Sequence, residues 1–594
     1  MKREKVGMVG VKEGLLIISL LVPAIGLAGS AAPWKINFKV SLEPGDTAGA
    51  GSAVPRLAPL HVPFSLPVSP GGSDFPVSGF HLSADSRQRP AGNEIANLPN
   101  SPFRAARAVS FKPRGRWGAA VLEFSLLHSY LTAKYWNRYR HWVEDWQWKP
   151  TWQDQKKRWF TTEAVRFDSN AFMVNSSHLF HGAINYNFSR TNRLSPLTSS
   201  LFTAAGSFLW EYFSEWREVF SVNDHFVTIA GGISLGEGLF QLGSYLRGRR
   251  GFHNRVLGFL FNPLQKLNTW LAGKSKEAPE AEYPEGYQDF RLFLGPMTEK
   301  SRPGAGSPSL FHAGFESRLI PVPGYGQPGS RKEKISRPLY SHTWARFDLG
   351  SSGSVERIEA GTRTIFAGHL RQSLRADASE RLVGYTLIWG WSSGIDFYRD
   401  KNVAWYDSSL DTMSDPRFPR ENPTAFTDKM VVVNLIGPEF RWSWFRPAWS
   451  AGLSIRGSPD FAMVNSLALN RYSALHDTSG IKTTLLSWGY YFAFGVTLAA
   501  EAWLDIAGID LKARVAYHGF DSIEGLDRFQ SLVHDDFNLV DTRLNWQVSA
   551  GFPIPRLPLR CGLVIEGNRR TGRIKGLEEK AGGIKIYYRI GLRI

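Results

Sequence analysis

The sequence contains a single cysteine, Cys561, among its 594 residues. An intrachain disulfide is therefore excluded, and cysteine usage gives no information about the redox compartment. Beyond the first 30 residues, no segment approaches the roughly 18 uninterrupted apolar residues of an ordinary membrane-spanning helix. If the chain lies in a membrane, it must therefore cross that membrane with strands, whose backbone groups pair in a closed ring.

The chain also lacks the short motifs of several enzyme classes. It has no HExxH run, no Glu-x-x-His run of the kind found in di-iron bundles and no phosphate-binding GxxxxGK[ST] loop. The stretches GSPD and GSFL do not form a nucleophile elbow. Catalysis is therefore not the favoured interpretation, and an enzyme is kept as an alternative.

The N-terminus has the three parts of a secretory signal peptide. Basic residues precede the apolar run GLLIISLLVPAIGL (14–27), and small residues follow it. We predict a cleaved signal peptide over 1–30, with an uncleaved anchor as the alternative. Residues 31–110 are rich in Pro, Gly and Ser, which predicts a flexible spacer without a core.

The last segment, GGIKIYYRIGLRI, alternates strictly between apolar and polar residues. Ile584, Ile586, Tyr588, Ile590, Leu592 and Ile594 share one face, and Lys585, Arg589 and Arg593 share the other. Similar alternation recurs at 381–391, 490–499, 509–518, 543–552 and 557–566. Ile388 is an exception, since it falls on the polar face of its segment.

The length of these segments distinguishes a membrane barrel from a soluble sheet. Runs of about 9–11 residues suit strands that cross a bilayer at a tilt, and small or basic residues on the minor face suit a watery lumen. We predict the class α+β, with a transmembrane antiparallel β-barrel of about 12 strands over 286–594 and a small N-terminal helical domain. The alternative is a soluble periplasmic β-protein.

Between the spacer and the barrel the spacing becomes helical. We predict a helical domain over 111–250 and a linker over 251–285, with helices near 176–192, 197–219 and 224–247. Polar residues follow one face of the first two helices, among them His178, His181, Asn185, Ser207, Glu211 and Glu215. The third helix is dense in glycine, which predicts close approach of a neighbouring element.

Three sequence blocks in this domain resemble a known family. HLFHGAINYNFSR, SFLWEYFSE and SVNDHFVTIAGGISLGE are similar to the signature of the uncharacterised bacterial envelope family catalogued as domain of unknown function 3943. The similarity covers roughly 115–247, and Leu179 stands where the family usually has proline. The resemblance implies an envelope protein with a β-rich C-terminal part, and it implies no activity.

The resemblance and the polar faces together define the candidate binding residues. These are His178, His181, Tyr186, Arg190, Trp210, Glu211, Glu215, Asn223, Asp224 and Glu237. The favoured interpretation is a polar network that holds the helices together, because buried polar groups must be paired. The alternative is a catalytic centre of His178, His181, Glu211 and Asp224, whose side chains are suitable metal ligands. We predict no metal and no cofactor.

The net charge of +17 and the pI of about 9.7 indicate an anionic partner. The Trp-rich basic segment 135–160 could stack single-stranded nucleic acid, but lipid contact is favoured for an exported protein. The expected partners are outer-membrane lipid and an anionic solute or glycolipid. The lumen is expected to be positive and to favour anions, unless its arginines pair with carboxylates such as Asp510 and Glu566.

The sequence therefore predicts a protein of the bacterial outer membrane. It would be a pore, a receptor or a structural envelope component, with the helices as a lumen plug or as a periplasmic domain. The alternative is an envelope enzyme that acts on lipid or glycolipid through His178, His181, Glu211 and Asp224.

Overall fold

The computed structural model describes residues 115–139, 147–249, 251–271, 286–300, 309–350, 355–400 and 428–593. These described residues all belong to one of the two units into which the chain divides. The predicted signal peptide and spacer, residues 1–110, lie outside the described residues, as does the end of the predicted linker, 272–285.

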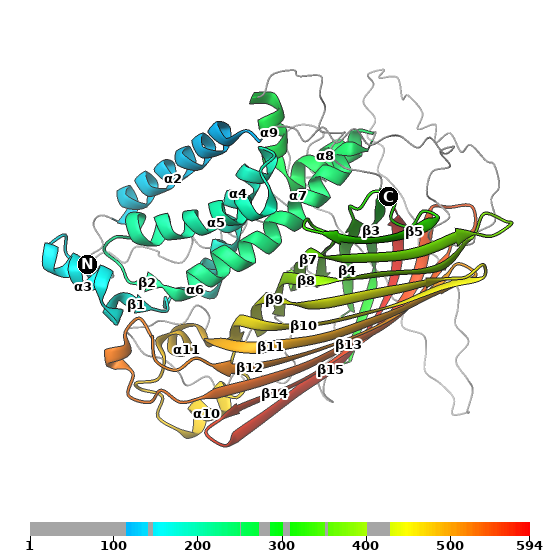
Figure 1. Ribbon diagram of the computed structural model, residues 1–594. Coiled ribbons are helices and arrows are strands. Elements are labelled where there is room, and N and C mark those ends of the chain that lie inside the picture. The colour runs from blue at the N-terminus through cyan, green and yellow to red at the C-terminus, as the bar shows by residue number, and fades with distance from the viewer. Residues whose placement is uncertain are drawn as a thin grey trace, which may run out of the picture. The chain divides into compact units, whose positions relative to one another are not determined.

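Twelve antiparallel strands pair side by side into a closed ring, because β7 hydrogen-bonds with both β6 and β8 (Figure 1). The strands are β3 (Tyr287–Lys300), β4 (Ser309–Ile320), β6 (Tyr340–Leu349), β7 (Val355–Ala376), β8 (Leu382–Asp400), β9 (Asp428–Phe445), β10 (Trp449–Asn465), β11 (Tyr490–Ile506), β12 (Ile509–Ser522), β13 (Leu539–Pro553), β14 (Leu559–Ile574) and β15 (Leu577–Arg593). A short strand, β5 (Gly329–Ile335), pairs with the far end of β7. The predicted barrel and its strand number are confirmed.

Apolar and polar side chains take opposite sides of the barrel wall, as the alternation predicts. On β15, Tyr588 is 59% exposed, whereas Lys585 is 5% exposed and Tyr587 is fully buried. Exposed apolar side chains continue around the ring, among them Trp391, Phe440, Ile455, Phe494, Leu498 and Val548. Because large apolar groups avoid water, this outer surface is suited to lipid.

Two departures from the alternation have local causes. Ile388 points inward and packs in a small apolar cluster with Tyr325 and Ile335, which follow β4 in the chain. Tyr490 and Phe492 lie on the outward face of β11, yet both are buried. They are buried because helical residues cover them from outside the barrel.

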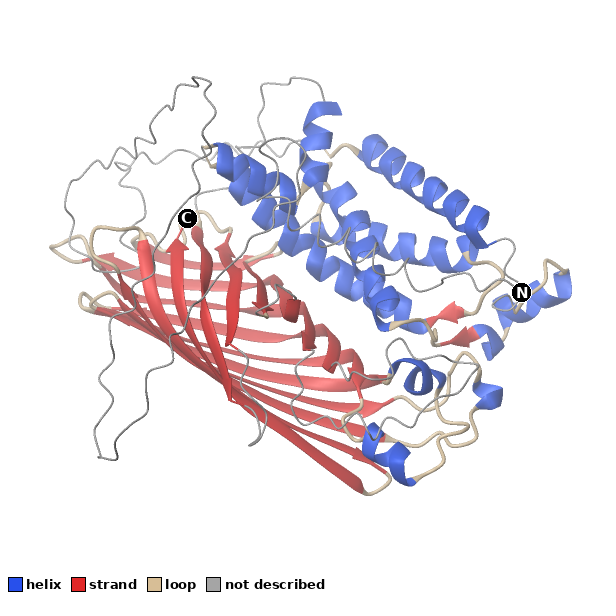
Figure 2. Ribbon diagram, turned by 180° about the vertical axis from the view of Figure 1, so that it is seen from behind, coloured by secondary structure: helices blue, strands red, loops and turns tan. Residues whose placement is uncertain are grey.

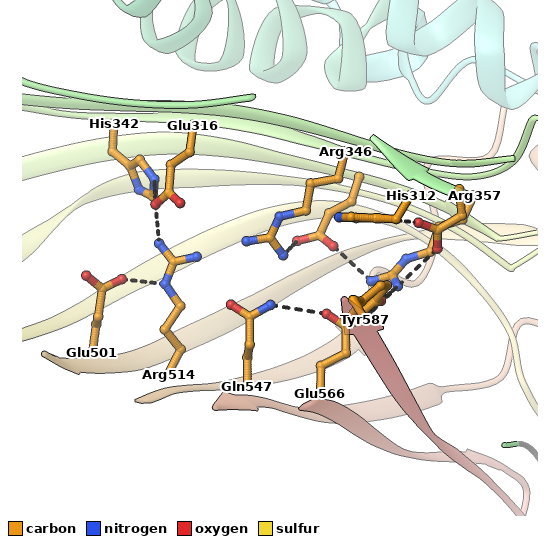
Figure 3. Close-up of polar contacts among 12 residues, drawn as sticks. His312, Glu316, His342, Arg346, Arg357, Glu501, Arg514, Gln547, Glu566 and Tyr587 are labelled. Atoms are coloured by element: carbon orange, nitrogen blue, oxygen red, sulfur yellow. Dashed lines mark hydrogen bonds and ion pairs between the residues drawn. The ribbon is translucent and has the colours of Figure 1, made fainter. Parts of the chain in front are cut away.

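Charged side chains bridge the inside of the barrel from wall to wall (Figure 3). Arg318 on β4 meets Glu501 on β11 at 2.7 Å, and these strands stand six places apart in the ring of twelve. Further pairs join strands well separated around the ring: Arg357 to Glu566, Arg543 to Asp428, Lys585 to Asp400 and Arg291 to Asp510. The inward arginines are therefore largely paired with carboxylates, and the cavity among them measures about 200 Å³.

The connection between β10 and β11 closes the barrel at the end opposite to the start of β3. It contains two short helices, α10 (Leu469–Leu475) and α11 (Thr483–Trp488). Leu469 and Leu485 pack in one apolar cluster with the inward-facing Val432, Val464 and Tyr491. At this end the barrel interior is therefore filled by apolar side chains, in addition to the charged side chains that bridge the lumen.

The helical domain precedes the barrel. It contains α2 (Trp117–Tyr139), α3 (Trp152–Phe160), η2 (Thr162–Ala164), β1 (Val165–Arg166), α4 (Phe172–Thr191), α5 (Pro196–Leu209), η3 (Trp210–Ser214), β2 (Phe220–Ser221), α6 (Val222–His225), η4 (Phe226–Gly231) and α7 (Gly232–Gly248). Both η3 and η4 are π-helical turns. The expected second helix therefore ends at Ser214, and the third is one continuous run built from α6, η4 and α7.

The predicted linker over 251–285 is in part wrong. Its first half forms two helices, α8 (Phe252–Phe261) and α9 (Pro263–Leu271). Phe261 of α8 packs with Leu242, Leu246, Phe290 and Leu319. The whole segment was predicted as a linker because its second half is rich in Pro and Glu, and this prediction missed the apolar residues of the first half.

The helices lie on the outside of the barrel wall (Figures 1 and 2). Leu179 and Val227 pack against the outward-facing Ile395, Val433 and Phe461 at one end of the strands. Near the opposite end of the strands, α8 and the last turns of α7 pack against β3 and β4. Figure 3 shows strands between the helices and the lumen side chains.

The described contacts therefore do not support the expected lumen plug. Close approach to the outer wall depends on glycine: a Cβ added at Gly238 would lie 2.1 Å from the Thr362 hydroxyl oxygen on β7. Inside the barrel, the space that a plug would need is occupied by the charged side chains described above.

The helical domain has polar side chains inside and apolar ones outside. Asn185, Ser189, Thr203 and Glu237 are buried. Its exposed side chains include Trp117, Leu122, Leu126, Leu197, Leu201 and Phe213. Among the described helices, none is both long and apolar enough to cross a bilayer.

Candidate functional site in the helical domain

Three elements bring together one histidine and two carboxylates. His178 comes from α4, Glu211 from the π-helical turn η3 and Asp224 from α6. One ligand atom of each lies within 4.8 Å of the other two, and His178 Nε2 is 3.5 Å from Asp224 Oδ2. Glu211 and Asp224 are each 1% exposed. We call this set the His178 cluster.

Backbone and side-chain hydrogen bonds fix the two carboxylates. Glu211 Oε2 accepts from the Ser221 backbone N–H at 3.0 Å, which ties η3 to the start of α6. Asp224 Oδ1 accepts from the Asn223 amide at 3.0 Å. The side-chain oxygen Oδ1 of Asn223 in turn accepts from the Asp168 backbone N–H at 2.9 Å. Paired strands β1 and β2 hold these two chain segments side by side.

The cluster is electrostatically unusual because several carboxyl groups are buried together. Burial, followed by the neighbouring Glu215 and Asp168, holds the pKa of Glu211 well above its usual range. Burial, followed by Asp168 and Glu211, does the same for the pKa of Asp224. Burial also lowers the pKa of His178, which favours the neutral imidazole that can act as a metal ligand.

Nearby arginines are directed to other acceptors. Arg158 is fully buried, and its guanidinium donates to the backbone oxygens of Glu211, Glu215 and Glu218. Arg528, from the β12–β13 connection, pairs with Asp168 at 3.3 Å and with Glu218 at 2.9 Å. The charge of Arg158 also acts on the nearby Glu211 carboxyl and opposes the rise of its pKa.

His181 does not join this cluster. Its ring packs against His128 at a centroid distance of 5.2 Å and against Trp210 at 5.6 Å. Burial lowers the pKa of His181 to about 3, so its ring is neutral. Trp210 donates from Nε1 to Glu215 Oε1 at 2.8 Å. The structure thus brings together three of the four residues in the catalytic alternative.

A second buried cluster lies between α4 and α7, and we call it the Glu237 cluster. Glu237 Oε2 accepts from the Tyr186 hydroxyl at 2.6 Å and from Arg190 Nε at 2.8 Å. Its other oxygen accepts from Arg190 Nη2 at 3.2 Å and from Gln241 at 2.9 Å. Every side of this carboxylate has a donor, which is the arrangement of a structural network.

Six of the ten candidate residues therefore lie in two clusters with different chemistry: His178, Glu211 and Asp224 in one, and Tyr186, Arg190 and Glu237 in the other. Asn223 supports the first cluster, and His181, Trp210 and Glu215 contact one another beside it. Several neighbours were missed by the sequence reasoning, namely Arg158, Asp168, Ser221 and Arg528. Arg158 is in the Trp-rich segment, where its burial had no sequence signal. Arg528 lies about 300 residues further along the chain than Glu218, so only the folded structure brings it here.

The family comparison covers this domain. Residues 164–264 match the family model described as "Domain of unknown function (DUF3943)". The resemblance read from the three sequence blocks is confirmed, and the matched residues include all ten candidate residues. No curated protein matches the chain.

Several solved barrels align with about half of the chain at low similarity. OmpT of Vibrio cholerae, an outer membrane protein, has 10% identity and a TM-score of 0.18, covering 52% of this chain and 99% of its own. The translocator domain of the autotransporter NalP from Neisseria meningitidis has 8% identity and a TM-score of 0.17, covering 56% and 95%. OprB of Pseudomonas putida has 8% identity and a TM-score of 0.18, covering 55% and 97%. These TM-scores are too low to assign a fold, and the barrel is instead established by its strand pairing.

Proposed function

We propose that this is an outer-membrane protein whose barrel is a closed scaffold and whose working part is the helical domain on its outer wall. Two features support this proposal. The lumen is bridged by ion pairs, and a histidine and two carboxylates converge outside the barrel, in the His178 cluster. The location is supported by the apolar outer surface of the barrel.

The observation that carries the proposal is the set of ion pairs across the lumen. Arg318 and Glu501 come from opposite walls, and each is at most 10% exposed at its side chain. Buried pairs of this kind cost several kcal/mol to separate. A solute would have to break them in order to pass, and the pairing also removes the free positive charge on which an anion pore would depend.

Bilayer conductance tests this proposal. The full chain, purified in detergent and reconstituted into planar bilayers, is expected to give no steady channel current. The double variant Arg318→Ser with Glu501→Ser removes one cross-lumen pair and is expected to raise the frequency of current steps. A large, steady open-channel current from the unmodified protein would overturn the closed scaffold.

A second candidate function is an envelope enzyme that acts on lipid or glycolipid. It is favoured by the convergence of His178, Glu211 and Asp224 in a domain whose exposed side chains are apolar. Glu211→Gln is expected to abolish a change in outer-membrane lipid composition that overproduction of the unmodified protein causes, as measured by mass spectrometry. Identical lipid profiles with and without the protein would eliminate this candidate.

A further inference from the structure

The His178 cluster contains a buried oxygen atom with an unmet requirement. Asp224 Oδ2 finds no hydrogen-bond donor among the residues that the structure describes. The ring nitrogen of the same cluster, His178 Nε2, lies 3.5 Å from it. A buried carboxylate oxygen without a partner costs free energy, because its water ligands are lost and not replaced. A positively charged ligand bound to this oxygen would remove that cost.

The three donor groups are of the right types for a metal ion. One imidazole nitrogen and two carboxylate oxygens form the mixed nitrogen and oxygen set that divalent first-row metals accept. They come from three separate elements, α4, η3 and α6, so they can surround an ion. Three protein ligands also leave a coordination position open, as in catalytic zinc sites.

Hydrogen bonds from the surroundings hold the two carboxylate ligands in place. The Ser221 backbone N–H donates to one oxygen of Glu211, and the Asn223 side-chain amide donates to one oxygen of Asp224. Neither of these hydrogen bonds occupies the second oxygen of the carboxylate. Such hydrogen bonds orient metal ligands. Arg158 and Arg528 are directed to backbone oxygens and to Asp168 and Glu218.

We propose that His178, Glu211 and Asp224 bind a divalent transition-metal ion such as Zn²⁺ or Mn²⁺. This departs from the sequence-based prediction of a metal-free protein, because the sequence could not show that the three side chains meet. The inference goes beyond the scaffold role and does not depend on it. A conducting barrel would overturn the scaffold and leave the metal site standing.

Metal analysis of the full chain in detergent micelles tests the site. Chelator-treated protein is equilibrated with Zn²⁺ or with Mn²⁺, dialysed and analysed for bound metal by mass spectrometry. About one ion per chain is expected for the unmodified protein. Asp224→Asn is expected to bind at least about tenfold more weakly, since even supporting residues of metal sites contribute that much.

Glu218→Gln is the matched control. It makes the same carboxyl-to-amide change in the same domain, at a residue that pairs with Arg528 instead of belonging to the cluster, and it is expected to bind metal as the unmodified protein does. Heat-dependent gel mobility reports whether each variant is folded. If Asp224→Asn does not fold, His178→Gln takes its place.

The absorption spectrum of the Co²⁺-loaded unmodified protein gives a result that needs no variant. Visible bands that zinc displaces would support the site. The proposal is overturned if the unmodified protein binds no ion, or if the folded cluster variants retain it with unchanged affinity.

Discussion

The two buried clusters of the helical domain are built from similar residues and differ in how well they are satisfied. In the Glu237 cluster, the carboxylate has four donors from Tyr186, Arg190 and Gln241. In the His178 cluster, Asp224 Oδ2 has no donor among the described residues, and two carboxylates lie close together. The first arrangement stabilises the fold by itself, whereas the second is complete only with a cation.

Both clusters depend on the same helix contact, so the difference between them is not one of position in the core. The helices α4 and η4 approach so closely that a Cβ added at Gly182 would lie 1.9 Å from the Thr228 backbone oxygen. The pair of clusters therefore shows that polarity alone does not identify a functional site. The number of unmet hydrogen bonds is more informative.

The largest effect is expected from Glu237→Ala. This change leaves the guanidinium of Arg190 buried without its carboxylate, and breaking a buried pair in this way costs about 3–5 kcal/mol. Denaturant unfolding in detergent, followed by tryptophan fluorescence, measures the loss. A change below about 1 kcal/mol, the net value of one ordinary hydrogen bond, would contradict the structural role of the Glu237 cluster.

Metal ion is expected to stabilise the unmodified protein through the other cluster. At a free Zn²⁺ concentration 100 times the dissociation constant, the gain is about 2.7 kcal/mol, because the ion binds only the folded form. The same unfolding measurement, with and without Zn²⁺, reports the gain. If Zn²⁺ stabilises Asp224→Asn by the same amount, the ion binds at a site other than the His178 cluster.

Asp224→Asn is expected to have a smaller effect of opposite sign when metal is removed. It eliminates an unpartnered buried oxygen from the carboxylate group, and such atoms cost about 1–3 kcal/mol. Chelator-treated Asp224→Asn should therefore unfold at a higher denaturant concentration than the chelator-treated unmodified protein. Destabilisation comparable to that of Glu237→Ala would show that the two clusters are alike.

The smallest effect is expected from His181→Phe. The new ring can keep the contacts with His128 and Trp210, and the imidazole that it removes is outside the ligand set. Zinc affinity should change by less than about twofold, as for residues that do not share a partner. A tenfold loss of zinc affinity would instead show that His181 belongs to the site, together with His178, Glu211 and Asp224.

The barrel was predictable because a strand has a period of two and each strand repeats the same signal. Tyr588 and Lys585 illustrate this, since their alternation alone assigns one to the outer and the other to the inner face. The helical candidates were predictable as a group from their shared faces and from the family blocks. Their separation into two clusters was not, because it depends on where η3 and α6 place Glu211 and Asp224.

The sequence by itself determined the barrel, an approximate strand number and the polar character of the helix interiors, because these follow from local periodicity. Only the tertiary structure decided that the helices cover the outer wall and that arginines bridge the lumen. It also decided that His178, Glu211 and Asp224 meet. Each of these facts joins residues far apart in the chain, and the physical reason is that close packing and charge pairing are set by distances in space.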